Sequence, residues 1–217
     1  MTLVISVGYA IIRFSLAPAD PDFALEHERL RSDYVLMIVQ CVLGLILMFL
    51  PAIIERRWSI DIPSRMEVVY FVFLYCAIYL GEVRNFYFVI PYWDSILHVF
   101  SSGMLGALGY TLVDTLNESK NVRLLLSPFF VSLFAFCFAL SMGAIWELYE
   151  FLMDFFFGTN MQKFALENGT LLIGQAALAD TMKDIIVDAI GAGIVVTIGA
   201  MTIKKGRKKV DFAALKR

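Results

Sequence analysis

Long apolar runs, separated by short polar or charged segments, dominate this sequence of 217 residues. A transmembrane helix needs about 20 predominantly apolar residues, because the hydrocarbon core of a bilayer is about 30 Å thick. Most of the runs reach or approach that length, whereas the first is shorter and is interrupted by Arg13. The runs predict six transmembrane helices: Thr2–Ala17, Tyr34–Ile54, Met66–Val83, Ile96–Leu116, Leu124–Phe157 and Asp184–Ile203.

The composition excludes the main soluble classes of protein. The chain is 59% hydrophobic and only 18% charged, with a mean hydropathy of +0.74, whereas a soluble domain is about 45–50% apolar and about 25% charged. Disorder and a disulfide-rich scaffold are therefore excluded, and the net charge of −2 predicts no nucleic-acid partner. We expect an all-α, polytopic transmembrane bundle of about six helices, with residues 1–217 forming a single integral domain in the lipid bilayer.

The first run has two interpretations. Its length also suits the apolar region of a signal peptide, and Leu16–Ala19 loosely resembles a cleavage region. However, no basic residue precedes the run, and Pro18 beside the candidate cleavage site is a poor fit. We therefore expect a retained first helix.

Lysine and arginine predict the orientation, because cytoplasmic loops carry an excess of both. Six helices place the two termini on the same side of the membrane. The basic residues on that side are Arg56, Arg57, Arg65, Lys120, Arg123, Lys204, Lys205, Arg207, Lys208, Lys209, Lys216 and Arg217. The opposite side carries Arg29, Arg31, Arg84, Lys163 and Lys183. Both termini are therefore predicted to be cytoplasmic.

Ionisable side chains lie at the ends of the last three predicted helices, although such a group costs about 3 kcal/mol within a membrane span. Spacings of three or four residues place the members of each set on one face of a helix. The sets are Asp94 and His98; Glu147 and Glu150, followed by Asp154; and Asp180, Asp184 and Asp188. In the predicted topology all three sets lie near the outer surface, at a similar depth.

Adjacent carboxylates repel one another unless protons or a cation intervene, so these sets predict a shared metal site. One histidine with several carboxylates suits a divalent zinc, manganese or iron ion. The candidate ligands are Asp94, His98, Glu147, Glu150, Asp180, Asp184 and Asp188. Taken singly, each residue also has a structural interpretation. Asp94 and Asp180 would suit helix caps, Asp154 an interfacial acid, and His98 a packed polar residue.

Two further segments bear on this site. Leu124–Phe157 contains 34 residues, which is too long for one simple span, so we expect it to tilt or to bend near Ser141-Met142-Gly143. Leu171–Ala179 is apolar although it precedes the sixth predicted helix, and it would suit a re-entrant or surface segment over the acids. Small residues around Gly103 and Gly106 should bring the fourth helix close to the fifth or sixth.

Three sequence blocks occur in a characteristic order: Trp93-Asp94-x-x-x-His98, Trp146-Glu147-x-x-Glu150, and Asp180-Thr181-x-x-Asp184 with Gly191-Ala192. In these blocks the chain resembles the uncharacterised YjdF-like family of bacterial inner-membrane proteins, over about residues 60–200. It is more remotely similar to the VanZ-like family, in which a glutamine and an asparagine stand in place of Glu150 and Asp188. The resemblance implies a bacterial inner-membrane location and a multi-helix fold, but no reaction.

The leading functional hypothesis is metal-assisted hydrolysis or group transfer on a lipid-linked or envelope substrate. Glu147 or Glu150 would be the general base, and Asp94, His98 and Asp184 would be metal ligands. One alternative is a cation- or proton-coupled transporter, although no inverted repeat is visible. The other is a non-catalytic membrane partner protein, in which the acids only determine helix packing.

Overall fold

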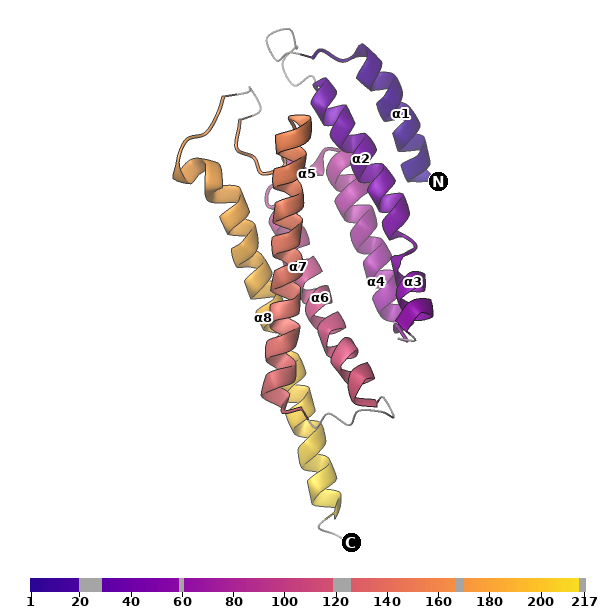
Figure 1. Cartoon of the computed structure of the whole chain (residues 1–217), viewed down its shortest axis with the longest axis vertical. Coiled ribbons are helices and arrows are strands. Elements are labelled where there is room, and N and C mark those ends of the chain that lie inside the picture. Colours follow the sequence, from indigo (N-terminus) through magenta and orange to yellow (C-terminus); the bar gives the residue numbers. More distant parts are fainter. Residues whose placement is uncertain (20–28, 59–60, 119–125, 167–169, 215–217) are drawn as a thin grey trace. The chain divides into compact units, whose positions relative to one another are not determined.

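The computed structural model describes residues 1–19, 29–58, 61–118, 126–166 and 170–214 (Figure 1). The fold is all-α, as the sequence predicts. Its helices are α1 (Thr2–Leu16), α2 (Arg31–Leu47), α3 (Leu50–Trp58), α4 (Ser64–Leu74), the π-helix η2 (Tyr75–Val83), α5 (Phe86–Val89), α6 (Trp93–Glu118), α7 (Pro128–Phe157) and α8 (Gln175–Ala214).

Within the described residues, five helical segments are long and apolar enough to cross a membrane. These are Arg31–Arg57, Ser64–Val83, Trp93–Val113, Pro128–Phe157 and Gln175–Thr202. Helix α1 is also apolar, but its 15 residues extend over only about 22 Å. A topology with six crossings therefore requires α1, which is shorter than the five other segments. Lys120, Arg123, Lys216 and Arg217, which contribute to the predicted orientation, lie outside the described residues.

Two predicted runs are interrupted by changes in the backbone. The second run divides into α2 and α3, and Pro51 lies in the first turn of α3, where its missing N–H group is tolerated. The third run changes from α4 to the π-helix η2, in which the N–H of Arg84 donates to the carbonyl of Tyr79, 2.9 Å away. The apolar pattern does not predict this second change.

Helix α7 is shorter than the predicted run Leu124–Phe157, whereas α8 is longer than the predicted run Asp184–Ile203. Helix α7 is continuous through Ser141-Met142-Gly143, and it ends where Gly158 adopts a φ of 63°. Helix α8 begins at Gln175, because the alanine-rich turns before Asp184 favour a helix despite their charged residues. Most of the segment predicted to lie over the acids, Leu171–Ala179, therefore belongs to the approach and first turn of α8.

Backbone contacts divide the chain into two units. Unit 1 comprises Met1–Leu97 and Ile145–Asp184, and unit 2 comprises His98–Ala144 and Ile185–Arg217. The core of unit 1 is formed by α1, α2, α4 and η2. Its buried apolar residues are Leu3, Ala10, Ala17, Tyr34, Met37, Cys41, Leu74 and Ile78.

Arg13, the charged residue within the first apolar run, lies beside this core. Its Nε donates to the hydroxyl of Tyr34, 3.1 Å away, and its guanidinium lies 5.8 Å from the centre of the Tyr34 ring. A neighbouring aromatic ring and a hydrogen bond partly compensate for moving the charge out of water. The arginine therefore does not prevent Thr2–Leu16 from forming an apolar helix.

In unit 2, small residues allow α6 to pack closely on two other helices. A Cβ at Gly109 of α6 would lie 2.8 Å from the Cα of Ala135 in α7. A Cβ at Gly106 would lie 3.8 Å from the carbonyl oxygen of Ala192 in α8. The predicted use of small residues to bring the fourth membrane helix against the fifth or sixth is therefore confirmed.

Helix α8 has an acidic buried face and an apolar exposed face. Asp184 and Asp188 are each 1% exposed. Isoleucines spaced by four residues are more than half exposed on the other face: Ile186, Ile190, Ile194 and Ile198. In a membrane helix, the ionisable face belongs inside the protein and the apolar face against lipid.

Candidate metal centre

Five of the predicted ligand carboxylates lie in unit 1, on three helices, and we call them the acid group. Asp94 lies in the first turn of α6, Glu147 and Glu150 lie on α7, and Asp180 and Asp184 lie on α8. Glu147, Glu150 and Asp184 are buried, and the other two are partly buried. Carboxylate oxygens of Asp94 and Asp184 lie within 4.8 Å of each other, and so do those of Glu147 and Glu150. The sequence-predicted acids of unit 1 are therefore neighbours.

Glu150 belongs to one of these pairs of carboxylates and interacts electrostatically with the other pair. Its Oε1 accepts a hydrogen bond from Nε1 of Trp146, one turn earlier on α7, at 2.9 Å. Its carboxylate also lies within electrostatic range of four charged groups of unit 1: Glu147, Asp94, Asp184 and Lys163. The tryptophan therefore orients a carboxylate that lies among other charges.

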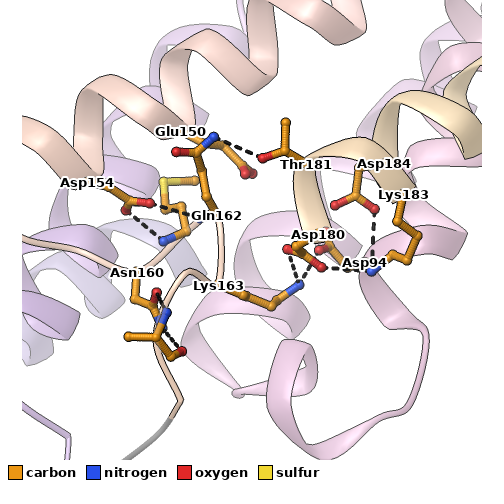
Figure 2. Close-up of polar contacts among 12 residues, drawn as sticks. Asp94, Glu150, Asp154, Asn160, Gln162, Lys163, Asp180, Thr181, Lys183 and Asp184 are labelled. Atoms are coloured by element: carbon orange, nitrogen blue, oxygen red, sulfur yellow. Dashed lines mark hydrogen bonds and ion pairs between the residues drawn. The ribbon is translucent and has the colours of Figure 1, made fainter. Parts of the chain in front are cut away.

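Two lysines contact this acid group, and sequence reasoning treated both only as loop charges. Lys163 Nζ is ion-paired with Asp94 Oδ2 and lies 3.1 Å from Asp180 Oδ2. Lys183 Nζ lies 2.8 Å from Asp180 Oδ1 and 3.7 Å from Asp184 Oδ1. Figure 2 shows Asp180 with both lysines beside it. Asp180 is therefore the carboxylate that the two ammonium groups share.

The charge of Lys163 is maintained by its neighbours. Burial alone would lower the pKa of Lys163, but the carboxylates of Asp94 and Asp180 outweigh burial and raise that pKa above its ordinary value. Lys163 is therefore an ammonium group at neutral pH.

Asp154 anchors the segment that brings Lys163 to the acids. Its Oδ1 accepts hydrogen bonds from the Thr159 hydroxyl and the Met161 N–H, both at 2.7 Å, and its Oδ2 accepts one from the Gln162 N–H at 2.9 Å. Lys163 itself has a φ of 49°, which a residue with a side chain seldom adopts. Asp154 is 9% exposed. It is therefore a buried anchor of this turn.

Further hydrogen bonds join the two ends of the turn that carries Lys163 and attach this turn to α8. The Asn160 side chain donates to the Ala165 carbonyl (2.7 Å) and accepts from the Ala165 N–H (3.0 Å). The Gln162 side chain donates to the hydroxyl of Thr181, 2.9 Å away. These contacts, drawn in Figure 2, hold Lys163 beside the acids on α6 and α8.

In unit 2, the buried side chains of His98 and Asp188 lie together. His98 Nδ1 is 3.3 Å from Asp188 Oδ1. A Cβ at Gly143 of α7 would overlap Asp188 Oδ2, so glycine leaves the space that this carboxylate occupies. A carboxylate that contacts one ring nitrogen of a histidine fixes the orientation of the imidazole ring.

Within unit 1, two pairs of carboxylates could contribute ligands to a metal ion. One pair is Asp94 and Asp184, and the other is Glu147 and Glu150. Helix α6 carries His98 one turn after Asp94, so both residues lie on one face of the helix. The two remaining sequence-predicted ligands have other contacts, because Asp180 pairs with lysines and Asp188 pairs with His98.

Glu82, in the π-helix η2, is a polar residue that sequence reasoning missed. Burial raises the pKa of Tyr87 well above its ordinary value, and nearby carboxylates, including those of Asp94, Glu82 and Glu150, raise it further. Glu82 therefore lies in the same electrostatic environment as the acid group. Its position inside an apolar run was the available signal, because ionisable residues are rare in membrane spans.

The family comparison supports the membrane class. Residues 23–205 match a family described as "Predicted membrane protein (DUF2238)". An uncharacterized protein of Thermotoga maritima is 28% identical over 143 residues, which cover 66% of this chain and 66% of that relative. No solved structure matches the chain. The family match includes all of the acid, histidine and lysine residues described above, and neither description names a reaction.

Proposed function

The chain belongs to the predicted membrane protein family DUF2238, and we propose that this multi-pass protein is a metal-dependent hydrolase or transferase. Its acid group binds one divalent ion of zinc, manganese or iron. The protein lies in a bacterial inner membrane with both termini in the cytoplasm, so that the acid group faces outward. Its substrate is a lipid-linked or envelope molecule whose head group reaches that interface.

The observation that carries this proposal is the gathering of carboxylates from three helices in unit 1. Oxygens of Glu147 and Glu150 lie within 4.8 Å of each other, and so do oxygens of Asp94 and Asp184. Lys163 and Lys183 contact the more exposed of these acids. Burying several like charges is strongly unfavourable unless a cation compensates for them. A divalent ion supplies that compensation, and carboxylate oxygens with an imidazole nitrogen are suitable ligands.

Each side chain has a role in the proposed reaction. Asp94, His98 and Asp184 hold the ion, which when bound supplies Lewis acidity toward substrate and water. Glu147 or Glu150 accepts the proton of the attacking water as general base. The contact between Asp188 and His98 supports a role for Asp188 in orienting the imidazole ring.

Metal content of the purified full-length protein tests the proposal. We expect elemental analysis in detergent to find about one divalent ion per chain, and His98→Ala and Asp184→Asn to lose it. Asp154→Asn is the matched control, because this acid on the same helix as Glu147 binds loop N–H groups, and its folded fraction should retain the ion.

Two results would contradict the proposal. The first is a parent protein that contains no ion and binds none when titrated with zinc, manganese or iron(II). The second is net ion uptake into proteoliposomes that depends on Glu147, because that result would identify the transporter alternative.

A further inference from the structure

The ammonium groups of Lys163 and Lys183 contact the two different oxygens of one carboxylate, that of Asp180. The distances are 3.1 Å from Lys163 Nζ to Oδ2 and 2.8 Å from Lys183 Nζ to Oδ1. Because both oxygens are bonded to a single carbon, at most about 8 Å separates the two nitrogen atoms. Such a separation matches an anion with several oxygens that accepts one hydrogen bond from each ammonium.

Both ammonium groups retain donor capacity. An ammonium has three N–H groups, and Lys163 contacts two carboxylates, those of Asp94 and Asp180. Lys183 makes one close contact, to Asp180, and a longer one to Asp184. Among the described residues, each lysine therefore has at least one N–H group for a further acceptor.

The exposure of these side chains increases from the acids to the lysines. The side chain of Asp184 is 1% exposed and that of Asp180 is 10% exposed, whereas those of Lys163 and Lys183 are 30% and 45% exposed. A ligand approaching the acid group from solvent therefore meets the ammonium groups at its edge. Positive groups beside a metal ion are the usual means of binding a transferring phosphoryl group.

We propose that Lys163 and Lys183 bind a phosphoryl group of the substrate beside the metal ion. This assignment depends on the proposed function, because without a bound cation the surrounding carboxylates would repel the anion. The substrate class is a phosphate monoester or diphosphate, whose unesterified oxygens contact both lysines. Asp180 positions the two lysines and is not a metal ligand.

Binding of inorganic phosphate to the full-length protein tests the assignment. The protein is held in phosphatidylcholine nanodiscs with Mn²⁺, and paramagnetic relaxation of the ³¹P signal reports phosphate near the ion. Lys163→Met and Lys183→Met should each weaken phosphate binding by about tenfold or more. Mn²⁺ affinity should be unchanged or higher, because a competing positive charge has been removed. Arg84→Met is the control, because Arg84 is an exposed base that follows η2, and it should leave phosphate binding unchanged.

A second arm identifies the source of the phosphoryl group. Nanodiscs that contain phosphatidic acid should compete with inorganic phosphate if the group belongs to a lipid, whereas a soluble phosphate monoester alone should compete if it does not. Either outcome supports the binding of a phosphoryl group by Lys163 and Lys183.

The two proposals fail in different ways. Mn²⁺ that stays bound while phosphate binds equally well to the parent and to both lysine variants would overturn the phosphoryl assignment alone. Phosphate that binds as tightly without Mn²⁺ would do the same. A parent protein that binds no Mn²⁺, zinc or iron(II) would overturn the proposed function. If Lys163→Met does not fold, Lys183→Met still carries the test from the more exposed position, and Lys183→Arg should restore phosphate binding.

Discussion

The buried carboxylate of Asp154 offers a sharp test of how the segment after α7 is held. In Asp154→Asn, the side-chain oxygen can still accept from Thr159 and Met161, but the amide NH₂ then faces the N–H of Gln162. A buried donor left without an acceptor costs about 1–3 kcal/mol, and hydrogen bonds to a neutral acceptor are weaker than those to a carboxylate. We therefore expect the free energy of unfolding to fall by about 3 kcal/mol.

The measurement is reversible unfolding of the full chain in mixed micelles, followed by circular dichroism. Thr159→Val is the matched control, because it removes one of the three donors and leaves both backbone contacts to Asp154 in place. It should cost only about 1 kcal/mol. If Asp154→Asn is no more destabilising than Thr159→Val, the carboxylate does not anchor the segment, and the account of how Lys163 is positioned is wrong.

Three other perturbations have defined outcomes. Gly143→Ala should displace the carboxylate of Asp188 and weaken metal binding by about tenfold or more in a titration, as Asp188→Asn should, because both changes alter the group that orients His98. Gly191→Ala places a methyl group where Val99 and Ser102 lie, and it should lower the free energy of unfolding by about 1–3 kcal/mol. The pKa of Lys163 is raised on folding, so its ion pairs contribute full stability below the unfolded pKa of about 10.4 and lose it as pH rises through the higher folded pKa. The difference in unfolding free energy between the parent and Lys163→Met should therefore be constant near neutral pH and should shrink above about pH 10.4.

The sequence predicts the helices well, because membrane spans depend on length and apolarity. Each predicted run corresponds to a helix or a pair of helices. Pro51 and the π-helix divide two of the runs, and α8 begins at Gln175, before its predicted start at Asp184. Helical periodicity also predicts that Asp94, Glu147 and Asp184 point into the protein, because i, i+3 and i+4 residues share a face. For these reasons, the acid group could be predicted from residue spacing alone.

The positions of Lys163 and Lys183 beside the acids could not be predicted from spacing. Lys163 reaches Asp94 and Asp180 through a turn that depends on hydrogen bonds to Asp154 and on a left-handed backbone at Lys163 itself. Periodicity carries no information about such a turn, since its geometry depends on individual side-chain contacts. The partner of His98 was similarly ambiguous, because Asp188 has the same helical spacing as a ligand but contacts the imidazole.

Because α8 has two distinct faces, insertions and deletions within this helix should be poorly tolerated. Asp184 and Ile186 are two positions apart, which is a rotation of about 200° around the helix axis, so buried acid and exposed isoleucine lie almost opposite each other. Inserting one residue between Asp184 and Asp188 would turn every later side chain by about 100° relative to Asp184. Asp188 would then leave the interior while isoleucine turned toward it. Many substitutions of the isoleucines by other apolar residues should be accepted, but insertions or deletions within these turns should not.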